Sequence, residues 1–443
     1  LLANSNNHLG YRQNLDTGAG PRSLAVSDLD ANGRPDFVTA NRDAGTVSTI
    51  LNNGAFDTRV DYPAGPAPSS VAVGDLNGDD RDDIVVVNET AGTVTILLAD
   101  VGVGYLGPLT KPVGSGPVDV IIDDLNSDQI LDLAVVNGTS ETLSLLFGLG
   151  GGDFAPHVQF ATNGRPTSLI AGDMNDDGKP DMVVANGNTN TVSVFPGDGT
   201  GGFGSGIHSV TGTNPVRLIC GTLDGDGSMD LVTANGGETS ISLLRGFGDG
   251  SFRPPLQTQL GAVPTSLALA RFGDDTFTGV LVTESADRRL TYLPGNGDGT
   301  FARAVYVGTE ADPRALAVAD LDLDGLADAA FLSGSSNIVS WCRNLSPVVT
   351  SQALPPLPTA PEIGIRVRPN PARGSVEFAV PGEAARDGAF EIFDMAGRFV
   401  FRSPLATGDA PGRFIWRGSD SSGASVPPGV YYLRWRKPGQ SSS

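Results

Sequence analysis

Long apolar runs and clustered basic residues are both missing from this chain of 443 residues. No stretch of 18 consecutive apolar residues occurs, and a helix needs about 20 to cross a bilayer, so we expect no transmembrane segment. Lys and Arg number 29 against 50 Asp and Glu, and they form no cluster. A nucleic-acid-binding protein needs a basic patch, so we also expect no nucleic-acid partner.

Cysteines and aromatic residues are few, whereas turn-forming residues are abundant. Two cysteines, Cys220 and Cys342, are too few for a disulfide framework, and we expect both to be small buried residues. Aromatic residues make up 7% of the chain, while it has 59 glycines and 31 prolines. This composition is typical of many short strands joined by turns.

Residue patterns of catalysis are also scarce. The three histidines, His8, His157 and His208, do not have the spacing of a zinc site, and no Gly-x-Ser-x-Gly sequence occurs. Residues 197–202 fit Gly-x-Gly-x-x-Gly, but they lie in an expected hairpin turn with no helix after it, so they do not indicate a dinucleotide site. We therefore predict that the protein is not an enzyme.

The most informative segment runs from Asp173 to Asp181. It places oxygen-bearing side chains at positions 1, 3, 5 and 9 of a nine-residue loop, and Gly178 at position 6. Glycine suits a tight turn that needs a positive φ. Carboxylate and amide oxygens are the ligands that Ca²⁺ prefers, and the carbonyl of Lys179 at position 7 is available as another.

This loop recurs along the chain. Related loops begin at Asp28, Asp75, Asp124, Asp173, Thr222, Arg271 and Asp320, and we number them 1 to 7. The first step is 47 residues and the other five are 49 residues each. A fixed period of this length indicates repeated units of supersecondary structure.

Each unit reads as four strands. A proline precedes the first, short apolar strand; the acidic loop leads into a second apolar strand, and the third strand ends at a glycine-rich turn with an aromatic residue. Five units carry Asn at position 14, where we expect it to end the second strand by adopting a left-handed conformation and capping the turn. These residues are Asn41, Asn88, Asn137, Asn186 and Asn235. Four strands repeated seven times predict a seven-bladed β-propeller over residues 1–344.

The two ends of the propeller suggest how its ring closes. The last unit offers three strands, and Leu9–Arg12 align with the fourth strand of a unit, so we predict that the N-terminal segment completes the last blade. Leu1–Asn4 instead align with the end of a third strand. Because the chain starts within a repeat and without Met, we expect a mature product or a fragment, and an eighth upstream blade is the alternative.

The repeat stops after residue 344. Residues 345–361 form a proline-rich linker, residues 362–437 a second all-β domain, and residues 438–443 a tail. We expect this domain to be a small β-sandwich. Its expected strands are 365–367, 376–380, 390–393, 399–401, 414–416 and 430–435.

The repeats resemble the FG-GAP and VCBS families, the units of integrin α-subunit propellers and of many bacterial surface proteins. The resemblance rests on the Asp-x-Asp/Asn-x-Asp-Gly-x-x-Asp loops and on turns such as Asp298–Phe301, in seven copies over residues 1–344. It implies a calcium-binding, integrin-like propeller that acts outside the cell.

The C-terminal domain resembles the FlgD-like, immunoglobulin-like domain that serves as a type IX secretion sorting signal. The matching segments are Pro369–Pro371, Asp394–Arg398, Ser422–Gly423 and Pro428–Tyr432. The resemblance implies a secreted bacterial protein, extracellular or at the cell surface.

The loops differ in their ligand sets. Loops 1, 2, 3, 4 and 7 have four oxygen-bearing side chains each, loop 5 has Thr222 in place of the first Asp, and loop 6 has lost its ligands. The five complete sets are Asp28, Asp30, Asn32 and Asp36; Asp75, Asn77, Asp79 and Asp83; Asp124, Asn126, Asp128 and Asp132; Asp173, Asn175, Asp177 and Asp181; and Asp320, Asp322, Asp324 and Asp328. Their position-7 carbonyls belong to Arg34, Arg81, Ile130, Lys179 and Leu326. The weaker loop 5 offers Asp224, Asp226, Asp230 and the carbonyl of Ser228.

An acidic turn held by side-chain hydrogen bonds without metal is the alternative explanation of any single loop. Seven loops in register favour calcium, with five strong sites, one weak site and one lost. Asp80 in loop 2 and Gln129 in loop 3 replace the glycine at position 6. The loops show no open position for chemistry, so we expect the calcium to be structural, and Arg271 is expected to place a cation where loop 6 lacks its metal.

The expected function is therefore non-enzymatic. We expect an extracellular calcium-stabilised propeller that acts in cell adhesion, binds a protein or glycan at the cell surface, or assembles through its C-terminal domain into a filament or layer. A carbohydrate-binding lectin is the alternative, and a polysaccharide lyase is a weaker one. Three glycosylation sequons begin at Asn88, Asn137 and Asn344, and we expect no glycan on them.

Overall fold

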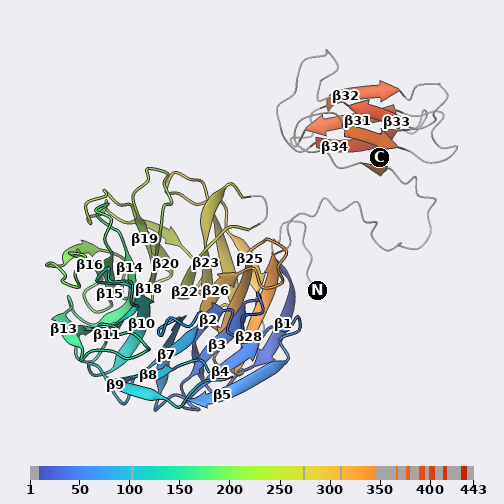
Figure 1. Ribbon diagram of the computed structural model, residues 1–443. Coiled ribbons are helices and arrows are strands. Elements are labelled where there is room, and N and C mark those ends of the chain that lie inside the picture. The colour runs from blue at the N-terminus through green and yellow to red at the C-terminus, as the bar shows by residue number, and fades with distance from the viewer. Residues whose placement is uncertain are drawn as a thin grey trace. The chain divides into compact units, whose positions relative to one another are not determined.

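The computed structural model describes residues 9–100, 104–272, 275–309 and 312–344, together with six strands between Arg366 and Arg436. The chain divides into two compact units, Leu1–Pro347 and Val348–Ser443. Seven four-stranded antiparallel sheets make up the first unit, arranged around a ring (Figure 1). The predicted linker 345–361, the tail 438–443 and residues 1–4 lie outside the described residues.

The seven sheets are the blades of a propeller, each ordered as predicted from first to fourth strand. Blade 1 holds β2 (Pro21–Ser27), β3 (Asp36–Asn41), β4 (Thr46–Leu51) and β5 (Thr58–Pro63). Blade 2 holds β6 (Pro68–Gly74), β7 (Asp83–Asn88), β8 (Thr93–Leu97) and β9 (Leu109–Pro112). Blade 3 holds β10 (Pro117–Asp123), β11 (Asp132–Asn137), β12 (Thr142–Leu146) and β13 (Val158–Ala161). Blade 4 holds β14 (Pro166–Gly172), β15 (Asp181–Asn186), β16 (Thr191–Phe195) and β17 (Ile207–Val210).

The remaining three blades follow the same order. Blade 5 holds β18 (Pro215–Gly221), β19 (Asp230–Asn235), β20 (Ser240–Leu244) and β21 (Leu256–Gln259). Blade 6 holds β22 (Pro264–Ala270), β23 (Phe277–Glu284), β24 (Arg289–Gly295) and β25 (Val305–Gly308). Blade 7 holds β26 (Pro313–Ala319), β27 (Asp328–Ser333), β28 (Ile338–Asn344) and β1 (Leu9–Asp16).

The two ends of the propeller meet in blade 7. β1 pairs antiparallel with β28, with Leu9 opposite Asn344 and Asp16 opposite Ile338. The innermost strands contact one another in chain order, and β2 of blade 1 contacts β26 of blade 7. The ring therefore closes with seven blades, which confirms the predicted closure by the N-terminal segment.

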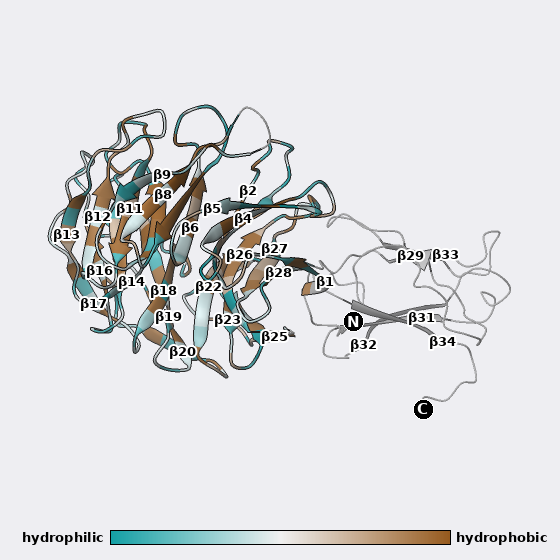
Figure 2. Ribbon diagram, turned by 90° about the horizontal axis from the view of Figure 1, so that it is seen from below, coloured by the Kyte–Doolittle hydropathy of each residue, from teal (hydrophilic) through white to brown (hydrophobic). Residues whose placement is uncertain are grey.

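The second strand of each blade is the most deeply buried. Every residue of β3, β7, β11, β15, β19 and β27 is buried, whereas the outer strands β5, β9, β13 and β21 are largely exposed. In Figure 2 the brown, hydrophobic colour accordingly lies within the blades. Apolar runs such as 84–87 are continuous because both faces of these strands pack against neighbouring blades.

The core consists of seven hydrophobic clusters, one at each junction between neighbouring blades. The junction of blades 7 and 1 joins Leu332 and Val339 to Phe37 and Ile50. Each blade thus buries its two faces against two neighbours, as in a solenoid closed on itself.

The aromatic residue of each glycine-rich turn strengthens these junctions. Phe56 of blade 1 lies 5.9 Å, between ring centroids, from Trp341 of blade 7. Tyr105 of blade 2 packs edge-on against Tyr62 of blade 1 at 5.1 Å. The turn aromatics therefore pack against the preceding blade, a role that the repeat alone does not specify.

The asparagines at position 14 end the second strands as predicted, but by a different mechanism. None of the five has a positive φ; in blades 1 to 4 the left-handed residue comes four positions later, as at Gly45 and Gly92. The asparagine side chains are buried and donate to hydroxyls on the third strand. Asn186 Nδ2, for example, donates to Ser193 Oγ at 2.8 Å. The expected left-handed conformation is therefore wrong, because a strand-to-strand hydrogen bond holds this residue.

The second unit contains two antiparallel three-stranded sheets, ordered β29-β30-β33 and β32-β31-β34. The strands are β29 (Arg366–Val367), β30 (Val376–Ala379), β31 (Ala389–Asp394), β32 (Phe399–Pro404), β33 (Arg413–Trp416) and β34 (Tyr431–Arg436). All six expected strands are present. Their packing as an immunoglobulin-like sandwich stays a prediction.

The expectation that both cysteines are buried is confirmed for Cys342 but not for Cys220. Cys220 and Cys342 are free, and Cys342 is buried while Cys220 is half-buried. In the described part of the chain, no helix has the length and apolar character needed to cross a membrane.

Candidate metal-binding loops

The seven acidic loops join the first and second strands of the blades, as predicted. In loops 1 to 5 and loop 7 the chain path turns through two left-handed residues, at positions 4 and 6. In loop 4 these are Asp176, with φ of 57°, and Gly178, with φ of 80°. The replacements at position 6, Asp80 and Gln129, adopt φ of 62° and 69°. The sequence indicated position 6, but not position 4, because position 4 is glycine in only two of the loops, at Gly78 and Gly225.

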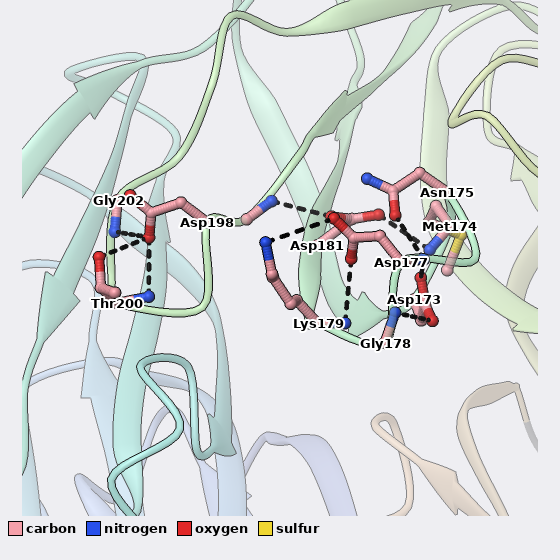
Figure 3. Close-up of polar contacts among 11 residues, drawn as sticks. Asp173, Met174, Asn175, Asp177, Gly178, Lys179, Asp181, Asp198, Thr200 and Gly202 are labelled. Atoms are coloured by element: carbon pink, nitrogen blue, oxygen red, sulfur yellow. Dashed lines mark hydrogen bonds and ion pairs between the residues drawn. The ribbon is translucent and has the colours of Figure 1, made fainter.

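The aspartate at position 1 organises the loop backbone. In loops 1, 2, 3, 4 and 7 its two carboxylate oxygens accept the backbone N–H groups of positions 5 and 6, at 3.0–3.1 Å and 2.7–2.9 Å. In Figure 3 the bonds run to Asp173 from Asp177 and Gly178. These bonds curl the loop around its first carboxylate.

The side chains at positions 3 and 5 tighten the same curl. The position-5 oxygen accepts the backbone N–H of position 7 at 2.8–3.1 Å in loops 1, 2, 3, 4, 5 and 7. In loops 2, 3 and 4 the Oδ1 atoms of Asn77, Asn126 and Asn175 accept the N–H of position 5. The oxygens at positions 1, 3 and 5 therefore surround one turn of backbone.

The aspartate at position 9 has a second role that the sequence did not indicate. It is the first residue of the second strand and is fully buried in six loops, at Asp36, Asp83, Asp132, Asp181, Asp230 and Asp328. One oxygen accepts the N–H of position 2 at 2.8–3.1 Å. The other accepts an N–H 16 residues later, at the end of the third strand or just beyond it, at 2.6–3.0 Å. Position 9 thus connects the loop to the third strand of its own blade.

Burial and mutual repulsion favour a cation at these loops. The pKa of Asp36, Asp83, Asp132 and Asp328 is raised to about 6, first by burial and then by the carboxylates at other loop positions, although two backbone hydrogen bonds to each carboxylate lower it. The same causes raise the pKa of Asp181 and Asp230. A bound divalent ion would offset this cost of ionisation.

Loops 1 and 7 bring three carboxylates close enough to share one ion. Oxygens of Asp28, Asp30 and Asp36 lie within 4.8 Å of one another, and so do those of Asp320, Asp322 and Asp328. Asp322 Oδ1 is also buried without a hydrogen-bond partner. An orphaned carboxylate oxygen inside an all-oxygen cluster fits Ca²⁺, and the loops with Asn at position 3 offer the same donor chemistry.

Loop 5 keeps the backbone connection but loses the organising carboxylate. Thr222 occupies position 1, while Asp230 still accepts the N–H groups of Leu223 and Gly246. Asp226 also lies 3.7 Å from the guanidinium of Arg253. The weaker calcium site at loop 5 stays a prediction.

In loop 6 a tyrosine of the third strand accepts the hydrogen bond that the position-9 aspartate accepts in the other loops. Gly279 stands at position 9, and the buried hydroxyl of Tyr292 accepts the N–H of Phe272 at 3.4 Å, the bond that an aspartate accepts in other loops. The same hydroxyl donates to Asp275 Oδ2 at 2.6 Å. Arg271 Nε donates to the carbonyl of Asp275 at 2.6 Å, so this arginine binds loop backbone.

A second polar group lies in the central channel and was not predicted. The inner strands present one equivalent residue each to the channel: Ser23, Ser70, Asp119, Ser168, Arg217, Ser266 and Ala315. Asp119 Oδ2 pairs with Arg217 Nη1 at 2.9 Å, two blades away. Its carboxylate also accepts the hydroxyls of Ser70 at 2.8 Å and Ser168 at 3.1 Å. The sequence signal for this ring is the repeat period, because each of these residues lies five residues before position 1 of its loop.

The sequon asparagines are not accessible in the folded propeller. Asn88, Asn137 and Asn344 are each at most 2% exposed. Two of them belong to the strand-ending set, so the fold accounts for these residues without a glycan.

The comparisons with known proteins agree with this architecture. Residues 5–86, 124–184 and 173–233 match the FG-GAP-like repeat family. The chain thus contains FG-GAP-like repeats folded as a seven-bladed β-propeller, and a search of curated proteins finds no match.

Solved structures share the fold at low identity. BBS1N in complex with ARL6DN is similar with a TM-score of 0.57 and 10% identity, over 76% of this chain and 96% of that one. A catalytically inactive virginiamycin B lyase from Staphylococcus aureus, solved with quinupristin, has a TM-score of 0.53 and 12% identity, over 75% and 98%. At these identities the likeness concerns the fold alone.

Proposed function

We propose that this propeller of FG-GAP-like repeats is a non-enzymatic, extracellular protein whose loops bind structural Ca²⁺. The observation that carries the proposal is the repeated loop geometry: in five loops, oxygens at positions 1, 3, 5 and 9 surround one curled backbone segment. Positions 4 and 6 are left-handed in each of these loops. Five similar geometries built from different intervening residues favour a common ligand over five independent acidic turns.

The ion would stabilise each blade from its loop. Position 1 holds the loop and position 9 holds the third strand, so an ion between them joins two parts of one blade. Extracellular modules bind Ca²⁺ at roughly 10⁻⁴–10⁻³ M. At tenfold excess of Ca²⁺ over the dissociation constant, each site would add about 1.4 kcal/mol to the free energy of unfolding.

The propeller would act as a rigid support for adhesion, partner binding or assembly. Its net charge of −21 and the resemblance of its second unit to a type IX sorting domain support secretion by a bacterium. A surface protein, a glycan or a second copy of the chain, joined in a filament, would be the partner.

A carbohydrate-binding propeller is the second candidate, because one junction offers a suitable cavity. Tyr62 and Tyr105 line it between blades 1 and 2, beside Asp30, Arg81 and Asp100. Aromatic faces with nearby polar groups suit a sugar ring. This cavity is the first place to look for glycan binding.

Two measurements on the whole chain separate these candidates. Electron microscopy and light scattering, with Ca²⁺ or a chelator, would detect assembly, and a glycan array would detect a sugar ligand. Calcium-dependent filaments or capture of a surface partner support the first proposal. Glycan binding that Tyr62→Ala abolishes, without assembly, would replace it with the second.

A further inference from the structure

An arginine at the end of the propeller lies against the ligands of loop 7. Arg343 is the penultimate residue of β28, and its Nε lies 2.5 Å from Asp322 Oδ2. Its Nη2 donates to Asp324 Oδ2 at 2.9 Å. One guanidinium therefore neutralises the carboxylates at positions 3 and 5 of the same loop.

The backbone beside this arginine is held by the same loop. Asn344 N donates to Asp328 Oδ1 at 2.6 Å. Loop 7 thus contacts the end of β28 twice, through a side chain at positions 3 and 5 and through the backbone at position 9. The backbone bond also forms in the four other complete loops, so only the side-chain contact of Arg343 is particular to loop 7.

The equivalent position distinguishes blade 7 from the other strong loops. Blades 1 to 4 carry Leu51, Leu98, Phe147 and Pro196 where blade 7 carries Arg343. None of these side chains has a positive charge to offer an aspartate. Loop 7 also has four carboxylates at positions 1, 3, 5 and 9, where the other loops have at most three, and so has the greatest need of a counter-charge among its ligands.

We propose that Arg343 is an internal counter-cation that occupies the ligands of loop 7 when calcium is scarce and lowers the calcium affinity of this loop. This inference rests on the proposed calcium binding. A divalent ion needs the oxygens of Asp322 and Asp324, and a guanidinium cannot coordinate a metal. Calcium binding at loop 7 therefore requires Arg343 to withdraw, and loop 7 fills last among the five complete loops.

The test is a calcium titration of the full chain by calorimetry, comparing wild type with Arg343→Gln. Loss of a partly exposed, charge-assisted pair should raise the affinity of the weakest complete site by about threefold to tenfold. The melting temperature in chelator should fall, because the carboxylates of Asp322 and Asp324 lose their counter-ion. The calcium-induced rise in melting temperature should therefore be larger for the variant.

Two controls make the result specific. In a chain that carries both Asp322→Asn and Asp324→Asn, Arg343→Gln should no longer change the calcium titration. In the otherwise wild-type chain, Arg343→Lys should behave in part like wild type, because it keeps the positive charge. Equal calcium affinities for wild type and Arg343→Gln, with calcium still bound at loops 1 to 4, would overturn the role of Arg343 alone. Absence of calcium binding in every variant would instead overturn the proposed function.

Discussion

Individual residues in the loops carry backbone strain that the sequence partly reveals. Position 6 has a positive φ in each of the five complete loops, whether it is Gly33 or Gln129. A Cβ built at Gly33 or Gly178 would meet no atom within 4 Å. The cost of a side chain at this position is therefore a cost of backbone conformation alone.

Replacing the two non-glycine residues should stabilise the propeller. Asp80→Gly and Gln129→Gly should each raise the free energy of unfolding by about 0.5–1 kcal/mol, because glycine adopts a positive φ without strain. Gly178→Ala should lower it by a similar amount. Urea denaturation at fixed calcium measures all three, and unchanged midpoints for Asp80→Gly and Gln129→Gly would contradict the account.

At the scale of the element, each complete loop combines a proposed metal site with backbone hydrogen bonds that hold the blade together. Asp177 at position 5 accepts one backbone N–H at the loop surface. Asp181 at position 9 is fully buried and accepts two, from Met174 and Gly197. The two aspartates are both expected ligands, but only position 9 is needed to hold the blade together.

A matched pair of substitutions separates these roles. In chelator, Asp181→Asn should lower the free energy of unfolding by about 2 kcal/mol, because its amide turns a donor toward a buried N–H. Asp177→Asn keeps its acceptor and should change stability little in chelator, while losing part of the calcium-induced stabilisation. Thermal melting with and without calcium measures both. Equal destabilisation by the two variants in chelator would contradict the proposed structural role of the position-9 aspartate.

The sequence predicted the elements better than the bonds between them. Periodic prolines, apolar runs and acidic loops were sufficient to place the strands and the closing strand Leu9–Asp16, because burial on both faces leaves few other arrangements. The bond from Asp181 to Gly197 and the left-handed Asp176 were not predictable. They depend on which backbone groups meet after folding, and aspartate at position 9 reads as a ligand whether or not it also accepts N–H groups.

For the whole molecule, stability depends on seven similar junctions and one unique contact across the channel. Asp119 accepts bonds from Ser70 of blade 2, Ser168 of blade 4 and Arg217 of blade 5. Its carboxylate is 7% exposed, while the arginine is 28% exposed. This pair fixes four blades relative to one another, and it breaks the repeat at a position that is otherwise serine or alanine.

Removing the arginine should weaken the ring. Arg217→Met keeps the apolar stem but leaves the Asp119 carboxylate with fewer donors, and should lower the free energy of unfolding by about 2 kcal/mol. Ser266→Ala changes the same ring position in blade 6 and serves as the control, with an expected effect below about 0.5 kcal/mol. Chemical denaturation compares the two. Equal effects would show that the pair of Asp119 and Arg217 does not add to the free energy of unfolding.

Calcium is the central claim for the whole molecule. Elemental analysis of the purified chain, followed by thermal melting with calcium and with a chelator, tests it most directly. The account predicts roughly five calcium ions per chain and a melting temperature that falls when they are removed. A chain without bound calcium whose melting temperature is the same in calcium and in chelator would contradict it.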